Sequence, residues 1–184
     1  HTKAAQQQED TISELNQLVN QIEHFDTIVD IQLRKLPSAE QRYHAITARM
    51  QEYLKAQRQL GNNPDTSFKR SQISFAISQG DFTAEQVHSK VQSAQSDFTT
   101  NSESLMKQVT QFEQTCHSAH NLPTDKSVPS EALNSACLKL LNTVIPSKKK
   151  FDAMTRILAH LEDIYQQERK TQKQLVQQAN QQAK

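Results

Sequence analysis

Apolar residues recur at steps of three and four along most of this chain, which is the spacing of one face of an α-helix. The first such stripe contains Ile12, Leu15, Val19, Ile22, Val29, Leu33 and Leu36. Asp26 falls on the same face, so the pattern places one carboxylate in an apolar seam. Because the stripe continues over several heptads before Pro37, it predicts a long helix of the coiled-coil kind.

Similar stripes follow over residues 43–60, 87–116, 133–145 and 151–175. Ser38–Gln41 and Thr83–Gln86 have the form of a capping box, which marks the start of a helix. Residues 65–80 fit a short helix, although 75–77 could also form a brief strand. Pro146 is expected to end or kink one helix, and Ser147 to cap the next.

Turn signals separate these stripes near residues 61–65, 80–82 and 121–129, where glycine or proline accompanies polar residues. The two ends of the chain, 1–10 and 176–184, are polar and are expected to fray. Short connections between long helices favour antiparallel neighbours. We therefore predict a single all-α domain over residues 1–184, an elongated antiparallel helical bundle built from coiled-coil-like hairpins.

The composition agrees with this architecture and limits the partners. Hydrophobic residues make up only 35% of the chain and there are two glycines, whereas compact globular domains are usually about 45–50% apolar. An elongated bundle needs fewer buried residues because each helix buries a stripe only. The net charge of +1, the 5% aromatic content and the absence of Trp give no sign of a nucleic-acid partner.

Cys116 and Cys137 lie on either side of the predicted turn at 121–129. In an antiparallel hairpin the two positions come level, so we predict a disulfide between them. Closing a loop of about 20 residues stabilises the fold by about 3 kcal/mol. Two free buried thiols are one alternative, and a zinc site with His117 and His120 is another, although the usual paired ligand spacings are absent. A disulfide favours a periplasmic or secreted location.

The sequence contains no motif of catalysis or cofactor binding. A P-loop, a dinucleotide fingerprint, G-x-S-x-G and H-E-x-x-H are all missing. Four further histidines are scattered singly and are expected at helix surfaces or boundaries: His24, His44, His88 and His160. We therefore predict no catalytic, cofactor-binding or metal-binding residue and do not expect an enzyme.

No run of about 20 apolar residues, the length of a membrane span, occurs in the sequence. The initial residue, His1, is compatible with removal of a signal peptide, a lipid anchor or a membrane span, and equally with a domain taken from a larger protein or with the remnant of a tag. Gln- and Ser-rich helices with one predicted disulfide are typical of bacterial envelope proteins.

The predicted function is a non-enzymatic extracytoplasmic helical protein that works through protein–protein interaction. Leu175 is an apolar residue in a polar stretch of the last helix, so it is expected on a contact surface for a partner or a second copy. The alternative is an extracytoplasmic ligand-sensing bundle of a membrane receptor, because long terminal helices suit a connection to membrane spans.

Overall fold

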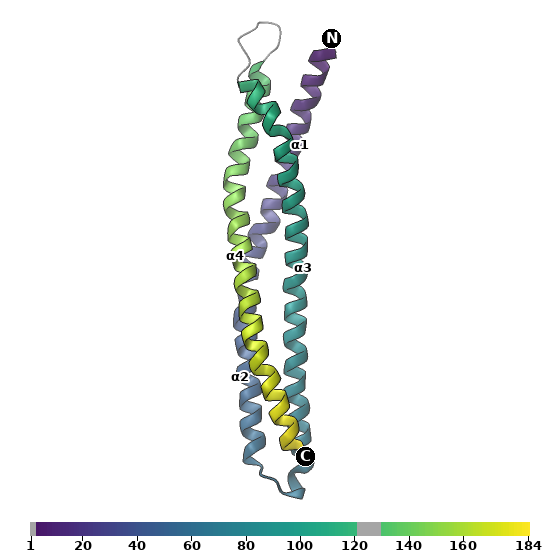
Figure 1. The fold of residues 1–184 in the computed structure, drawn as a ribbon, viewed down its shortest axis with the longest axis vertical. Coiled ribbons are helices and arrows are strands. Elements are labelled where there is room, and N and C mark those ends of the chain that lie inside the picture. The colour runs from purple at the N-terminus through teal and green to yellow at the C-terminus, as the bar shows by residue number, and fades with distance from the viewer. Residues whose placement is uncertain (1–2, 121–129) are drawn as a thin grey trace. The chain divides into compact units, whose positions relative to one another are not determined.

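The described part of the chain, residues 3–120 and 130–184 of a computed structural model, is almost entirely helical. The elements are α1 (Lys3–Lys35), α2 (Ser38–Gln59), the 3-10 helix η1 (Pro64–Thr66), α3 (Ser67–His120) and α4 (Ser130–Ala183) (Figure 1). No strand occurs among these residues, which confirms the predicted all-α bundle. Within the same ranges, none of the helices has an apolar segment long enough to cross a membrane.

The chain divides into two compact units. Unit 1 comprises the described residues of His1–Gln32 and Ser96–Met154, and unit 2 comprises Leu33–Gln95 and Thr155–Lys184. Each unit is built mainly from segments of three helices, with α1, α3 and α4 in the first and α2, α3 and α4 in the second.

Unit 1 has an aromatic core to which each helix contributes one ring. The ring centroids of Phe25, Phe98 and Phe151 lie 5.4 to 6.1 Å apart. Asp26, the carboxylate in the first apolar stripe, accepts a hydrogen bond of 2.7 Å from the buried hydroxyl of Ser147. The predicted role of Ser147 as a helix cap is therefore wrong: α4 continues through Pro146, and Ser147 fastens it to α1.

Unit 2 places its core between α2, α3 and α4. The buried cluster consists of Met50, Leu54, Ile77, Leu175 and Ala179. Gln172 of α4 donates to Thr47 of α2, and Gln57 of α2 donates to the Ala179 carbonyl of α4. Because the residue numbers of both helices rise from the first contact to the second, α2 and α4 run parallel. By contrast, α3 runs antiparallel to α4, since Arg70 bonds Gln182 while Glu85 bonds Tyr165. The antiparallel packing predicted for helices that follow one another in the chain is therefore confirmed for α3 and α4, while α2 and α4, which are not consecutive, run parallel.

The predicted turn at 80–82 is wrong, because α3 is continuous from Ser67 to His120. A Cβ added at Gly80 would lie 2.7 Å from Cγ and 2.9 Å from Sδ of Met50. Gly80 thus serves the close approach of α3 to α2, not a chain reversal. Thr83 donates its hydroxyl to the Gln79 carbonyl within the same helix, so the second capping box is not formed either.

The turn near 61–65 is present. Gly61 follows the end of α2 with φ +71°, a left-handed conformation that glycine adopts without strain. At the boundary between α1 and α2, Ser38 donates its hydroxyl to the Lys35 carbonyl and does not cap α2 as the sequence predicted. Only two residues separate the two helices. The predicted turn at 121–129 lies outside the described residues.

The prediction of frayed ends is wrong for the described residues, since α1 begins at Lys3 and α4 extends to Ala183. The end of α4 is held by polar contacts to α3: Ser74 donates to Asn180 at 2.6 Å, and Arg70 donates to the Gln182 carbonyl at 2.8 Å. Ala179 is fully buried. Small and amide side chains can therefore pack this segment although it carries few large apolar ones.

Candidate interaction groove

A disulfide joins α3 to α4 in unit 1. Cys116 and Cys137 are bonded, with their Cα atoms 5.5 Å apart, as the sequence predicted. Because both sulfurs are consumed in this bond, Cys116 cannot supply the thiolate that the zinc alternative required. Among the described residues, no three His, Cys, Asp or Glu side chains are grouped so as to hold a metal ion.

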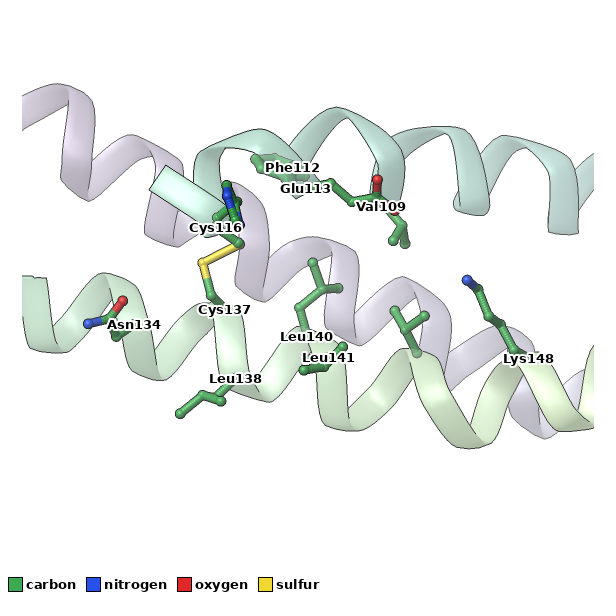
Figure 2. Close-up of a pocket in the computed structure, with 12 residues that line it drawn as sticks. Val109, Phe112, Glu113, Cys116, Asn134, Cys137, Leu138, Leu140, Leu141 and Lys148 are labelled. Carbon is green, nitrogen blue, oxygen red and sulfur yellow. A yellow bond between two sulfur atoms is a disulfide. The ribbon is translucent and has the colours of Figure 1, made fainter. Parts of the chain in front are cut away.

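Beside the disulfide, a groove of about 560 Å³ runs between α3 and α4 (Figure 2). Its walls are mainly apolar, with polar groups at intervals. The lining residues are Val109, Phe112, Glu113, Cys116, His117, Asn134, Cys137, Leu138, Leu140, Leu141, Val144 and Lys148. All of them belong to unit 1, so the groove is a feature of that unit alone.

The α4 side of the groove exposes large apolar side chains. Leu138, Leu141 and Ile145 are 58%, 52% and 50% exposed, while Leu140 and Val144 of the same helix are buried. This part of α4 is therefore apolar on two faces, only one of which packs against the other helices of unit 1. A helix that is apolar around its circumference is normally covered on all sides. The second face is thus a candidate contact surface.

A second exposed apolar stripe lies on α3 in unit 2. Phe68, Phe75 and Phe82 are 74%, 65% and 57% exposed and are spaced seven residues apart. Phe68 and Phe75 lie in the segment predicted as a short helix, and Phe82 lies at the predicted turn, so the sequence does not predict a continuous stripe here. Their heptad spacing, distinct from the core stripe through Ile77, was the signal that could have identified this surface.

A polar cluster of unit 2 surrounds His88. Its ring stacks on Tyr165 at 3.5 Å between centroids, and its Nε2 lies 2.8 Å from a carboxylate oxygen of Glu162. Tyr165 donates to Glu85 at 2.7 Å, and Arg169 pairs with the same carboxylate. His88 is only 8% exposed, so it is buried in this cluster and is not the surface or boundary residue that the sequence predicted. His24, His44 and His160 are exposed, as predicted.

The electrostatics of this cluster suit a structural role. Burial, and then the hydrogen bond to Glu85, raises the pKa of Tyr165 to about 12. Burial raises the pKa of Tyr43 as well. Hydrogen bonds from Gln166 and then His88 lower the pKa of Glu162, against the opposing effect of burial. The tyrosines therefore stay neutral and the carboxylate stays charged near neutral pH. These protonation states support the hydrogen bonds between α3 and α4, whereas an activated nucleophile would need a lowered pKa.

The assignment of Leu175 to a contact surface is wrong. Its side chain is 7% exposed and belongs to the unit 2 core with Met50, Leu54, Ile77 and Ala179. The polar residues near Leu175 suggest an exposed stretch, but Gln172 is also buried and donates a hydrogen bond to Thr47. The apolar surface lies instead on α4 of unit 1 and on α3 of unit 2.

Comparison of the chain with protein-family models, with curated proteins and with solved structures gives no match. The geometry of these surfaces is therefore the basis for inferring a function.

Proposed function

We propose that this is a non-enzymatic extracytoplasmic protein that works by binding another protein chain through its helix surfaces. The observation that carries the proposal is the arrangement of exposed apolar side chains. Six of them form two stripes at helical spacing: Leu138, Leu141 and Ile145 on α4, and Phe68, Phe75 and Phe82 on α3. Grouped exposed apolar side chains, unlike scattered ones, are typical of surfaces that a partner covers.

Helix-in-groove binding fits the α4 surface. Leu138 and Leu141 line the groove together with Val109 and Phe112 of α3. An amphipathic helix engages such a groove through anchor residues spaced three and four apart. The exposed residues of α4 have this spacing themselves, since Leu138, Leu141 and Ile145 are three and four positions apart.

The proposed extracytoplasmic location is supported by the disulfide. Bonds of this kind form and persist in oxidising compartments and are rare in a reducing cytosol. Alkylating free thiols in intact cells that make the protein, before lysis, tests this point. Cys116 and Cys137 should remain unmodified until a reductant is added; immediate labelling of both would contradict an oxidising location.

Site-specific photo-cross-linking tests the contact function. A photoreactive amino acid is placed at Leu138, Leu141 or Phe75 of the full chain in cells that make the protein. The matched controls are Lys90 on α3 and Lys170 on α4, which are exposed and polar. We expect discrete protein adducts at the stripe positions and few at the controls. Adducts that are equal at all five positions, or absent from the three stripe positions, would refute the proposal.

Ligand sensing is the second candidate function, and the size of the groove favours it. At about 560 Å³ the groove falls within the range of small-molecule sites, about 300–1,000 Å³. Native mass spectrometry of the purified protein should then show a bound small molecule that is lost when Val109→Trp fills the groove. Protein adducts at Leu138 without any retained small molecule would favour the contact function.

A further inference from the structure

The exposed face of α4 carries an ordered pattern of residue types. Starting at Glu131, positions at steps of three, four, three, four and three form one stripe along the helix. We call this the α4 stripe; its members are Glu131, Asn134, Leu138, Leu141, Ile145 and Lys148. At 1.5 Å per residue it is about 26 Å long. An acid stands at one end, a base at the other, and three large apolar residues lie between them.

This pattern is complementary to itself when reversed. If two copies of the helix lie antiparallel about the midpoint between Lys139 and Leu140, Leu138 of each copy faces Leu141 of the other. In the same register Glu131 of each copy faces Lys148 of the other. A parallel alignment would instead place like charges opposite each other at both ends of the stripe.

We propose that a second copy of this chain docks on the α4 stripe, with the two α4 helices antiparallel about a two-fold axis. The inference rests on the proposed contact function and names the partner. A two-fold interface requires a patch that complements itself. The α4 stripe meets this requirement in the charges at its two ends and in the two central Leu138–Leu141 pairs, while Ile145 of each copy faces Asn134 of the other. Asn134, Leu138, Leu141 and Lys148 also line the groove, so the docked helix reaches α3 as well.

The state of the terminal charges within one chain agrees with this assignment. Among the described residues, neither Glu131 nor Lys148 makes an ion pair, whereas the nearby Lys150 is bound to Asp30 at 3.2 Å. Both Glu131 and Lys148 are exposed. Docking of a second copy would supply each of them with an opposite charge.

The phenylalanine stripe on α3 lacks this property. Three residues beyond its two ends lie Asp65, which belongs to η1 and not to α3, and Glu85, so neither end offers a base to pair with the acid of a second copy. Moreover, Glu85 is already paired with Arg169. The chemistry of self-association therefore favours the α4 stripe.

Charge reversal tests both the surface and the register of the proposed dimer. The dissociation constant of the dimer is measured on the full chain by sedimentation equilibrium. In Glu131→Lys and in Lys148→Glu, both symmetry-related pairs become like-charged. Each variant should therefore dimerise about tenfold more weakly at low salt. The double variant restores opposite charges and should regain the wild-type dissociation constant. An equimolar mixture of the two single variants should form heterodimers in preference to either homodimer.

Matched controls come from α3 of the same unit. Glu103→Lys and Lys107→Glu make the same changes of charge at exposed positions off the stripe and should leave dimerisation unchanged. Leu141→Asn removes an apolar side chain from the centre of the stripe and should weaken dimerisation at least about tenfold. Because Leu141 is half exposed, the melting temperature of the monomer should change little.

A wild-type chain that stays monomeric at about 100 µM, well above the micromolar dissociation constants of ordinary interfaces, would overturn the proposal. So would a dimer that neither Leu141→Asn nor the single charge reversals weaken, since its interface would then lie elsewhere. These failures are distinct from failure of the contact function. A monomer that still forms adducts with a different protein at Leu138 refutes the second copy and leaves that function standing.

Discussion

Two tyrosines that pack against each other in unit 2 differ in how their hydroxyl groups are satisfied. The rings of Tyr43 and Tyr165 lie 5.6 Å apart. Tyr165 donates to Glu85, whereas the hydroxyl of Tyr43 is buried without a hydrogen-bond partner among the described residues. An unpaired buried hydroxyl destabilises a fold, while a bond to a carboxylate stabilises it. The two residues should therefore respond in opposite directions to loss of the hydroxyl.

We expect Tyr43→Phe to raise the free energy of unfolding by about 1 kcal/mol and Tyr165→Phe to lower it by about 1 kcal/mol. Urea denaturation at neutral pH measures both. The two variants act as controls for each other, because each removes one oxygen from the same aromatic cluster. Destabilisation by both substitutions to the same degree would show that the Tyr43 hydroxyl has a partner, such as an ordered water.

The raised pKa of Tyr165 predicts loss of stability at alkaline pH. In the folded chain this pKa is about 12, above the ordinary value of 10.0. The neutral form is therefore favoured by folding, and its contribution is fully present below pH 10 and is lost as the pH rises towards 12. Stability measured over this window should fall less steeply in Tyr165→Phe. An unchanged slope would contradict a shifted pKa at this residue.

Leu175 was expected at a contact surface and is instead part of a core. Since it packs against Met50, Leu54 and Ile77, Leu175→Asp would place a charge in an apolar cluster. We expect a loss of more than about 3 kcal/mol of stability, visible as a large drop in melting temperature of the monomer. Leu138→Asp is the matched control, because Leu138 is mainly exposed and its replacement should leave the melting temperature nearly unchanged.

At the scale of the element, Gly80 shows how packing can override a turn signal. Glycine costs a helix about 1 kcal/mol relative to alanine, yet α3 passes through this position without a break. A Cβ at this position would force the buried side chain of Met50 to shift, which explains the glycine. The same helix would have been divided into two by any argument from propensity alone.

We expect Gly80→Ala to destabilise the protein by about 1 kcal/mol, because overpacking against Met50 outweighs the gain in helix propensity. In a Met50→Ala background the conflict is removed, and the same substitution should become neutral or stabilising. A double-mutant cycle of unfolding free energies measures this coupling. Equal effects of Gly80→Ala in the two backgrounds would show that Met50 does not restrict this position.

On the scale of the whole chain, the disulfide is the one covalent link between distant parts of the sequence. It joins residues 21 positions apart and should stabilise the native state by about 3 kcal/mol through loop closure. We expect the double variant Cys116→Ser/Cys137→Ser to lose about that amount in thermal or urea unfolding. The wild type without reductant should weigh about 2 Da less than after reduction, as formation of one disulfide requires. Identical masses under both conditions would contradict the bond.

The sequence by itself determined the helical class, the chain reversal at Gly61 just after α2 and the pairing of Cys116 with Cys137. These features depend on local periodicity, on glycine with a positive φ and on residues that flank a single connection. Such signals are carried by neighbours along the chain, so they can be identified without knowing how helices pack.

Tertiary structure alone decided which apolar residues are buried. Leu175 and Leu141 both lie on apolar stripes of α4, yet Leu175 is enclosed by α2 and α3 while half of Leu141 stays exposed. The helical conformation at Gly80 and the burial of His88 likewise depend on side chains of other helices, Met50 and Glu162. A stripe specifies which face of a helix is apolar, but only the arrangement of neighbouring helices decides whether that face is covered within the chain or is left for a partner.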